Sequence, residues 1–119
     1  MSITILVFWS AVILASNQLW VVYHPGCPSC DSFLAEIVPE YPKNIFTNYN
    51  KFIPLKLLNA ELPIHQEIIA GIHPEIYSTP TFLYVQIKNS DITVLSRWLG
   101  YKSTKDFYTQ LDHAINLKK

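Results

Sequence analysis

Hydrophobic and polar positions follow two different periods along this chain. Short runs of β-branched and aromatic residues, each bounded by turn-forming residues, predict strands. Apolar residues at helical spacing predict helices, one beginning near residue 27 and the last capped by Ser103 with Asp106 three positions later. The predicted strands span 18–23, 52–58, 81–87 and 92–99, and a further helix spans 63–70.

The order of these elements is β-α-β-α-β-β-α. A β-α-β unit followed by a hairpin and a final helix predicts an α/β fold, with a central four-stranded mixed sheet and helices on both faces. The turn of the hairpin is expected at 88–91. About a hundred residues are enough for one modest core.

Three boundaries follow from helix-breaking residues and polar composition. Pro39 and Pro42 are expected to end or kink the first helix. The asparagine-rich stretch 43–51 is expected to be a polar connection. Gly71 is expected to stop the helix that begins at Pro63.

The N-terminus has a different character from the rest of the chain. Residues 3–15 are apolar apart from Thr4 and Ser10, which is too short for a comfortable membrane span but suits the apolar region of a signal peptide. We therefore expect a signal peptide or an N-terminal anchor at 1–17 and one domain at 18–119. A buried N-terminal element of a cytosolic protein remains the alternative.

Composition excludes several classes of function. The 119 residues include nine basic and nine acidic side chains, so the formal net charge is zero. The charge therefore gives no reason to expect binding to a nucleic acid or to another charged partner. Two cysteines are too few for a disulfide-stapled scaffold and supply half of a four-cysteine zinc site. We expect neither a cofactor nor a metal.

The two cysteines carry the candidate chemistry. Cys27-Pro28-Ser29-Cys30 lies between a predicted strand and a predicted helix, the setting of a redox motif. Cys27 is the candidate nucleophile, because free N–H groups and the helix dipole stabilise a thiolate at a helix start. Cys30 is the candidate resolving thiol, since the spacing lets it attack a mixed disulfide on Cys27. A purely structural bridge over so short a loop would contribute little stability.

Together with this motif, Thr79-Pro80 opens the third strand and Gly100 precedes the amphipathic last helix. In this arrangement the chain resembles the thioredoxin superfamily in its minimal form, over about residues 18–117. The resemblance implies a redox-active disulfide between Cys27 and Cys30. It also implies a cis Thr79–Pro80 peptide bond facing the cysteines, with both residues binding substrate.

The chain departs from thioredoxins proper at three positions. Val21 stands where thioredoxins carry a buried aspartate, and Gly26 precedes Cys27 where they carry a tryptophan. Pro28 resembles glutaredoxins and periplasmic oxidants of the Dsb type. These departures favour an oxidant or an isomerase, although periplasmic relatives include reductases, so the direction of exchange stays open.

His24 lies three residues before Cys27 and is a possible modulator of its pKa. As an imidazolium it would lower that pKa, and as a neutral base it could move protons. The alternative is an exposed loop histidine. Lys56, inside an apolar strand, is expected to carry its ammonium group out to solvent.

The sequence therefore predicts an exported thiol–disulfide oxidoreductase, periplasmic or secreted, or membrane-anchored with its domain outside the cytoplasm. Its partners would be protein substrates with thiols or disulfides and an upstream redox protein. The alternative is a non-enzymatic module that binds copper(I) or another soft metal through the two thiolates. The oligomeric state is not predicted.

Overall fold

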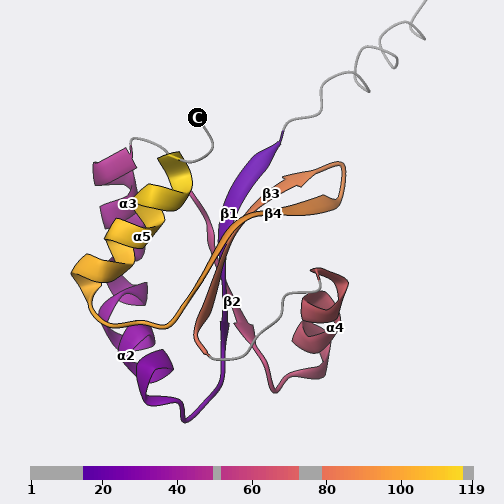
Figure 1. Ribbon diagram of the computed structural model, residues 1–119, viewed down its shortest axis with the longest axis horizontal. Coiled ribbons are helices and arrows are strands. Elements are labelled where there is room, and N and C mark those ends of the chain that lie inside the picture. The colour runs from indigo at the N-terminus through magenta and orange to yellow at the C-terminus, as the bar shows by residue number, and fades with distance from the viewer. Residues whose placement is uncertain (1–14, 50–51, 73–78, 117–119) are drawn as a thin grey trace, which may run out of the picture.

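The computed structural model describes residues 15–49, 52–72 and 79–116 (Figure 1). Its strands are β1 (Ser16–Tyr23), β2 (Leu55–Asn59), β3 (Thr81–Lys88) and β4 (Asp91–Leu99). Its helices are α2 (Pro28–Glu36), α3 (Tyr41–Tyr49), α4 (Pro63–Ile72) and α5 (Thr104–Asn116), with a 3-10 turn η1 (Val38–Glu40) between α2 and α3.

The strands form one four-stranded sheet in the order β2-β1-β3-β4. β1 pairs in parallel with β2 and antiparallel with β3, and β3 pairs antiparallel with β4. The predicted mixed α/β sheet is therefore confirmed. Asn89 and Ser90 form the β3–β4 turn with positive φ angles of 55° and 70°, the conformation that suits a two-residue hairpin loop.

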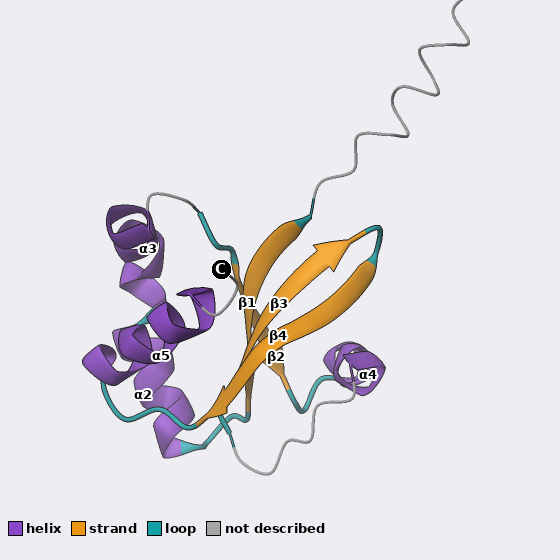
Figure 2. Cartoon of the chain, turned by 45° about the horizontal axis from the view of Figure 1, so that its top comes forward, coloured by secondary structure: helices purple, strands orange, loops and turns teal. Residues whose placement is uncertain are grey.

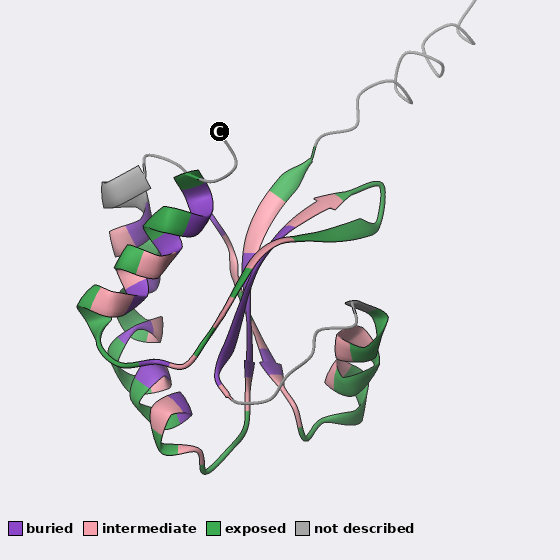
Figure 3. Ribbon diagram, viewed as in Figure 1, coloured by how far each residue is buried: buried purple, intermediate pink, exposed green. Residues whose placement is uncertain are grey.

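Helices cover both faces of the sheet, as predicted. Figures 1 and 2 show α2, α3 and α5 on one face and α4 on the other. On the three-helix face, the rings of Phe33, Phe82 and Phe107 lie 5.1 to 5.5 Å apart between centroids. On the α4 face, Trp20 and Leu83 belong to a smaller buried cluster. Burial on both faces explains why β1 and β3 are the most buried strands (Figure 3).

The sheet brings three chain segments to one end. Val22 near the end of β1 lies opposite Thr81 at the start of β3. Tyr23 lies beside Asn59 at the end of β2. The loop from β1 to α2, the turn from β2 to α4 and the entry to β3 therefore meet at this end, shown at the bottom of Figure 1.

The expectation of a polar connection at 43–51 is wrong, because residues up to Tyr49 belong to α3. Tyr41 and Ile45, four residues apart, are both buried on one side of this helix. The Tyr41 hydroxyl donates a hydrogen bond of 2.9 Å to the Ile53 carbonyl. Pro42 lies in the first turn, where the missing N–H of proline has no intrahelical partner to lose. Residues 50 and 51 lie outside the described residues.

Other boundaries differ by a few residues. β1 begins at Ser16, two residues earlier than predicted, and the Asn17 side-chain amide donates to the Tyr84 hydroxyl at 3.0 Å. β2 begins at Leu55 because Pro54 lacks an N–H, although its carbonyl accepts from Leu19 at 2.9 Å. α4 continues through Gly71 to Ile72. The predicted cap is confirmed: the Asp106 N–H donates to Ser103 Oγ at 3.1 Å.

Most of the predicted signal or anchor segment at 1–17 lies outside the described residues, which begin at Ala15. Within the ranges that the structure describes, no helix is long and apolar enough to cross a membrane.

Replacing Ile45 with alanine tests α3. Because Ile45 is fully buried, we expect the free energy of unfolding to fall by about 2–5 kcal/mol in urea denaturation. The matched control is Ile64→Ala on α4, where the side chain is 65% exposed and the change should stay within about 0.5 kcal/mol. Equal, small effects in both variants would mean that residues 41–49 do not pack as a helix.

Candidate active site

Cys27 is the N-cap residue of α2. Its backbone is extended, with φ −80° and ψ 119°, and Pro28 follows in the first turn. The Cys30 N–H donates to Cys27 Sγ at 3.3 Å, so the sulfur occupies the place that a capping oxygen usually takes. The preceding turn is closed by a hydrogen bond of 3.2 Å from the Cys27 N–H to the His24 carbonyl. Gly26 allows that turn, because its φ is +85°.

The entry to β3 faces this cap. The Cys27 thiol donates to the Thr79 carbonyl oxygen at 3.5 Å. The Thr79–Pro80 peptide bond is cis, and Pro80 is buried. The Gly100 N–H donates to the Pro80 carbonyl at 2.8 Å, which ties the end of β4 to the same loop. The structure thus brings together the four residues Cys27, Cys30, Thr79 and Pro80 that the sequence analysis assigned to the site.

The two thiols lie in different surroundings. Both are free cysteines, Cys27 partly exposed and Cys30 buried. The hydrogen bond from the Cys30 side chain is the main cause that lowers the pKa of Cys27, with smaller contributions from the Thr79 side chain and from the backbone N–H groups of Cys30 and Ser29. Burial is the main cause that raises the pKa of Cys30, and its hydrogen bond to Cys27 adds to this. Cys27 is therefore the thiol that ionises first.

The ring of His24 points elsewhere. Its Nε2 lies 3.3 Å from Glu61 Oε2, and its Nδ1 lies 3.0 Å from the Pro25 carbonyl. The groups that lower the pKa of Cys27 are Cys30, Thr79 and Ser29. A direct effect of the imidazole on the Cys27 sulfur therefore stays a prediction.

Sequence reasoning missed Glu61 as a residue of this end of the molecule. It lies three residues after the end of the strand predicted at 52–58. The signal was available in principle, because a parallel pair places the ends of both strands side by side. The Ala60 N–H donates to the Tyr23 carbonyl at 2.9 Å, which brings Glu61 next to His24.

This chain carries no charged side chain at the position where thioredoxins carry a buried aspartate. Val21 is fully buried in the apolar core, paired with Leu57 and Phe82. Lys56 is exposed, and its Nζ lies 5.1 Å from the centre of the Trp20 ring, in agreement with an outward-reaching lysine. Hydrogen bonds and burial, rather than a neighbouring carboxylate, therefore separate the acidities of the two thiols.

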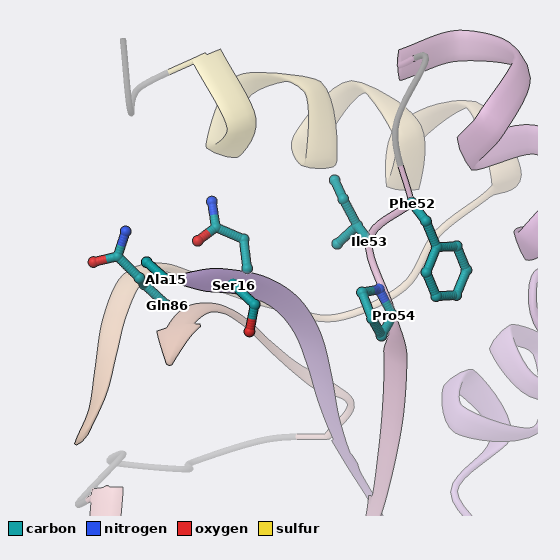
Figure 4. Close-up of a pocket in the computed structure, with 7 residues that line it drawn as sticks. Ala15, Ser16, Phe52, Ile53, Pro54 and Gln86 are labelled. Atoms are coloured by element: carbon teal, nitrogen blue, oxygen red, sulfur yellow. The ribbon is translucent and has the colours of Figure 1, made fainter. Parts of the chain in front are cut away.

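A hollow of about 500 Å³ lies at the start of β1, the opposite end of that strand from Cys27, and is lined partly by Phe52, Pro54 and Gln86 (Figure 4). Among the described residues, no group of three or more Cys, His, Asp or Glu side chains could hold a metal ion. No finding supports the metal-binding alternative, which would rest on the Cys27 and Cys30 thiolates alone.

Several solved structures similar to this chain are described as thioredoxins. The reduced periplasmic thioredoxin SoxS from Paracoccus pantotrophus is 24% identical, with a TM-score of 0.63 over 87% of this chain and 100% of that chain. A thioredoxin from Thermus thermophilus is 17% identical, with a TM-score of 0.59 over 84% and 74%. A complex of ferredoxin:thioredoxin reductase with thioredoxin f2 contains a chain that is 18% identical, with a TM-score of 0.53 over 83% and 77%.

No family model matches the sequence, and no curated protein matches it. At the identities of the solved structures, the likeness is one of fold. The chain has a thioredoxin-like fold, so the resemblance that the sequence showed is confirmed at that level.

The hydrogen bond between the two thiols makes a testable contribution to the acidity of Cys27. In Cys30→Ala the donor is lost, so the pKa of Cys27 should rise toward that of an ordinary thiol. In Cys30→Ser a hydroxyl can still donate, so the pKa should stay lower than in the alanine variant. Thiolate absorbance followed against pH measures both. An alanine variant whose Cys27 titrates no higher than in the serine variant would contradict this cause.

Proposed function

We propose that the protein is a thiol–disulfide oxidoreductase that exchanges disulfides with protein substrates through Cys27 and Cys30. The observation that carries the proposal is the placement of Cys27 Sγ. It caps α2, accepts from the Cys30 N–H at 3.3 Å and lies 3.5 Å from the Thr79 carbonyl. A partly exposed sulfur with a lowered pKa, backed by a buried second thiol, is the arrangement that such exchange requires.

The reaction moves two electrons in two exchange steps. The Cys27 thiolate attacks one sulfur of a substrate disulfide, which forms a mixed disulfide and releases a substrate thiolate that takes up a proton. Cys30 then loses its proton and attacks Cys27 Sγ. The substrate leaves with both sulfurs reduced, and Cys27 and Cys30 become a disulfide. The reverse sequence oxidises a substrate, and the relative reduction potentials set the direction.

Thr79 and Pro80 fit the role of substrate binding. While Cys27 is a thiol, its hydrogen occupies the Thr79 carbonyl. That hydrogen is lost when Cys27 ionises, before Cys27 attacks the substrate, so the carbonyl can accept an N–H from the bound peptide in both exchange steps. Thr79 would thus supply a backbone acceptor that holds the substrate in place.

Export and a redox partner are part of the proposal. The apolar segment 3–15 supports a signal peptide or an anchor ahead of the domain. The similar SoxS structure is described as a periplasmic thioredoxin. Another similar structure is a complex of a thioredoxin with a reductase, which supports an upstream protein that resets the Cys27–Cys30 pair.

Trapping substrates tests the assigned roles. Cys30→Ser should accumulate mixed disulfides with other proteins, because the resolving thiol is gone. Cys27→Ser should accumulate few, since Cys30 is buried. Non-reducing gels after rapid acid quenching, compared with the same samples under reduction, would show the difference. Equal trapping in both variants, or none in either, would contradict turnover through this dithiol.

Export makes a separate prediction about the native N-terminus. Because β1 begins at Ser16, a cut that leaves the strand whole falls at or before residue 15. N-terminal sequencing should therefore not begin at Met1 if the segment is cleaved. A protein that begins at Met1 and is recovered in the membrane fraction would indicate an uncleaved anchor. Met1 in the soluble cytoplasmic fraction would contradict export in both forms.

A further inference from the structure

The imidazole of His24 is held between two hydrogen-bond acceptors. Nδ1 lies 3.0 Å from the Pro25 carbonyl, and Nε2 lies 3.3 Å from a carboxylate oxygen of Glu61. A neutral imidazole carries one ring hydrogen, whereas an imidazolium carries two. Both contacts can therefore be hydrogen bonds only when His24 is protonated.

The partner carboxylate stands on a well-fixed turn. The Glu61 N–H donates to Asn59 Oδ1 at 2.9 Å. The neighbouring Ala60 N–H donates to the Tyr23 carbonyl at 2.9 Å, and the Leu62 N–H donates to the Asn59 carbonyl at 3.0 Å. Glu61 thus projects from a turn that is bonded both to itself and to the end of β1.

The other end of the contact holds the nucleophile. The carbonyl of His24 accepts the Cys27 N–H at 3.2 Å, which closes the turn that leads into the N-cap. A side-chain contact that fixes His24 therefore also fixes the backbone from which the Cys27 sulfur projects. The ring itself contacts Glu61 and Pro25 rather than the reacting sulfur.

We propose that His24 and Glu61 form an ionic clamp that positions the turn before Cys27, holding it while His24 is protonated and loosening as the imidazole loses its proton. The inference deepens the proposed function, on which it rests, and makes both residues positioning residues. Histidine is the side chain that changes charge near neutral pH, so the clamp would couple the active site to the pH of its compartment.

Other titratable groups lie next to the clamp in the structure, and they decide which control variants the experiment needs. Cys27 caps α2 and Cys30 lies in the first turn of that helix, directly after the clamped turn. His65 of α4 accepts the Asn59 N–H at 2.8 Å through Nδ1, so its protonation would weaken the turn that carries Glu61. The effects of His24 and His65 thus have opposite signs with pH, and variants can separate them.

The test is the rate at which iodoacetamide alkylates Cys27, measured across the pH range in which histidine titrates. Both clamp side chains are 52% exposed, so we expect a modest effect. Below the Cys27 titration, His24→Gln and Glu61→Gln should each slow alkylation by a factor of about two to five, the size of an exposed ion pair. The double variant should slow it no further, because both changes break one contact. At pH values where Cys27 is fully ionised in every protein, the alkylation rates of the variants and the wild type should converge.

Lysine at position 24 provides the rescue. His24→Lys keeps a positive charge opposite Glu61 but does not titrate near neutral pH, so it should alkylate at the wild-type rate at low pH. At pH values where His24 is neutral and Cys27 is still mostly a thiol, His24→Lys should alkylate faster than the wild type. His65→Gln should remove only the opposing effect of His65, and His113→Gln on α5 should change nothing. Thermal melting would show that each variant folds.

Two results would overturn the clamp. If the imidazolium acts on the Cys27 sulfur directly through its charge, Glu61→Gln should leave alkylation unchanged or faster. Additive losses in the double variant would likewise mean that the residues act separately. Alkylation needs only the Cys27 thiolate, so these outcomes are distinct from a failure of disulfide exchange, which would leave the clamp intact and remove only its proposed use.

Discussion

The antiparallel pairing of β1 with β3 is the constraint on which the site depends. It places Val22 opposite Thr81, and so brings the loop after β1 against the loop before β3. Burial on both sides of these strands fixes the register, because a slip of one residue would turn every side chain to the other face. With the register fixed, Cys27 at the start of α2 can meet the carbonyl of Thr79 across a single hydrogen bond.

The chemistry of the two thiols follows from their places on one helix turn. Cys27, at the cap, points its sulfur at N–H groups that have no partner within the helix. Cys30, one turn inside, is packed away from water. A cap stabilises a negative charge and burial opposes one, so a single turn of α2 separates a more acidic thiol from a less acidic one, as the proposed roles require. Val21 lies in the core at the position where thioredoxins carry an acid, so these two effects act without one there.

Much of this could be predicted because the signals were local. The strand patterns, the Cys27-Pro28-Ser29-Cys30 motif and the Ser103 cap each lie within a few consecutive residues. Helix α3 was missed because its inward side depends on contacts from distant parts of the chain. Tyr41 is anchored by the Ile53 carbonyl and packs near Phe107, and neither neighbour is visible from the polar residues around Asn44.

The contact of His24 with Glu61 was missed for a related reason. Each residue alone reads as an exposed side chain in a turn, and only the parallel pairing of Tyr23 with Asn59 brings the two turns together. The spacing along the sequence therefore identified the two candidate cysteines. The residues that contact the turn before Cys27 could be recognised only from the pairing of the strands in the sheet.

The central claim is that Cys27 and Cys30 form a dithiol made for exchange rather than for structure. The most direct measurement is the reduction potential of this pair, obtained by equilibrating the protein in glutathione or dithiothreitol redox buffers. The account predicts a reversible two-electron couple between about −270 and −120 mV, the range of exchange catalysts. A pair that forms no intramolecular disulfide, or one whose potential lies below about −300 mV as in structural disulfides, would contradict it.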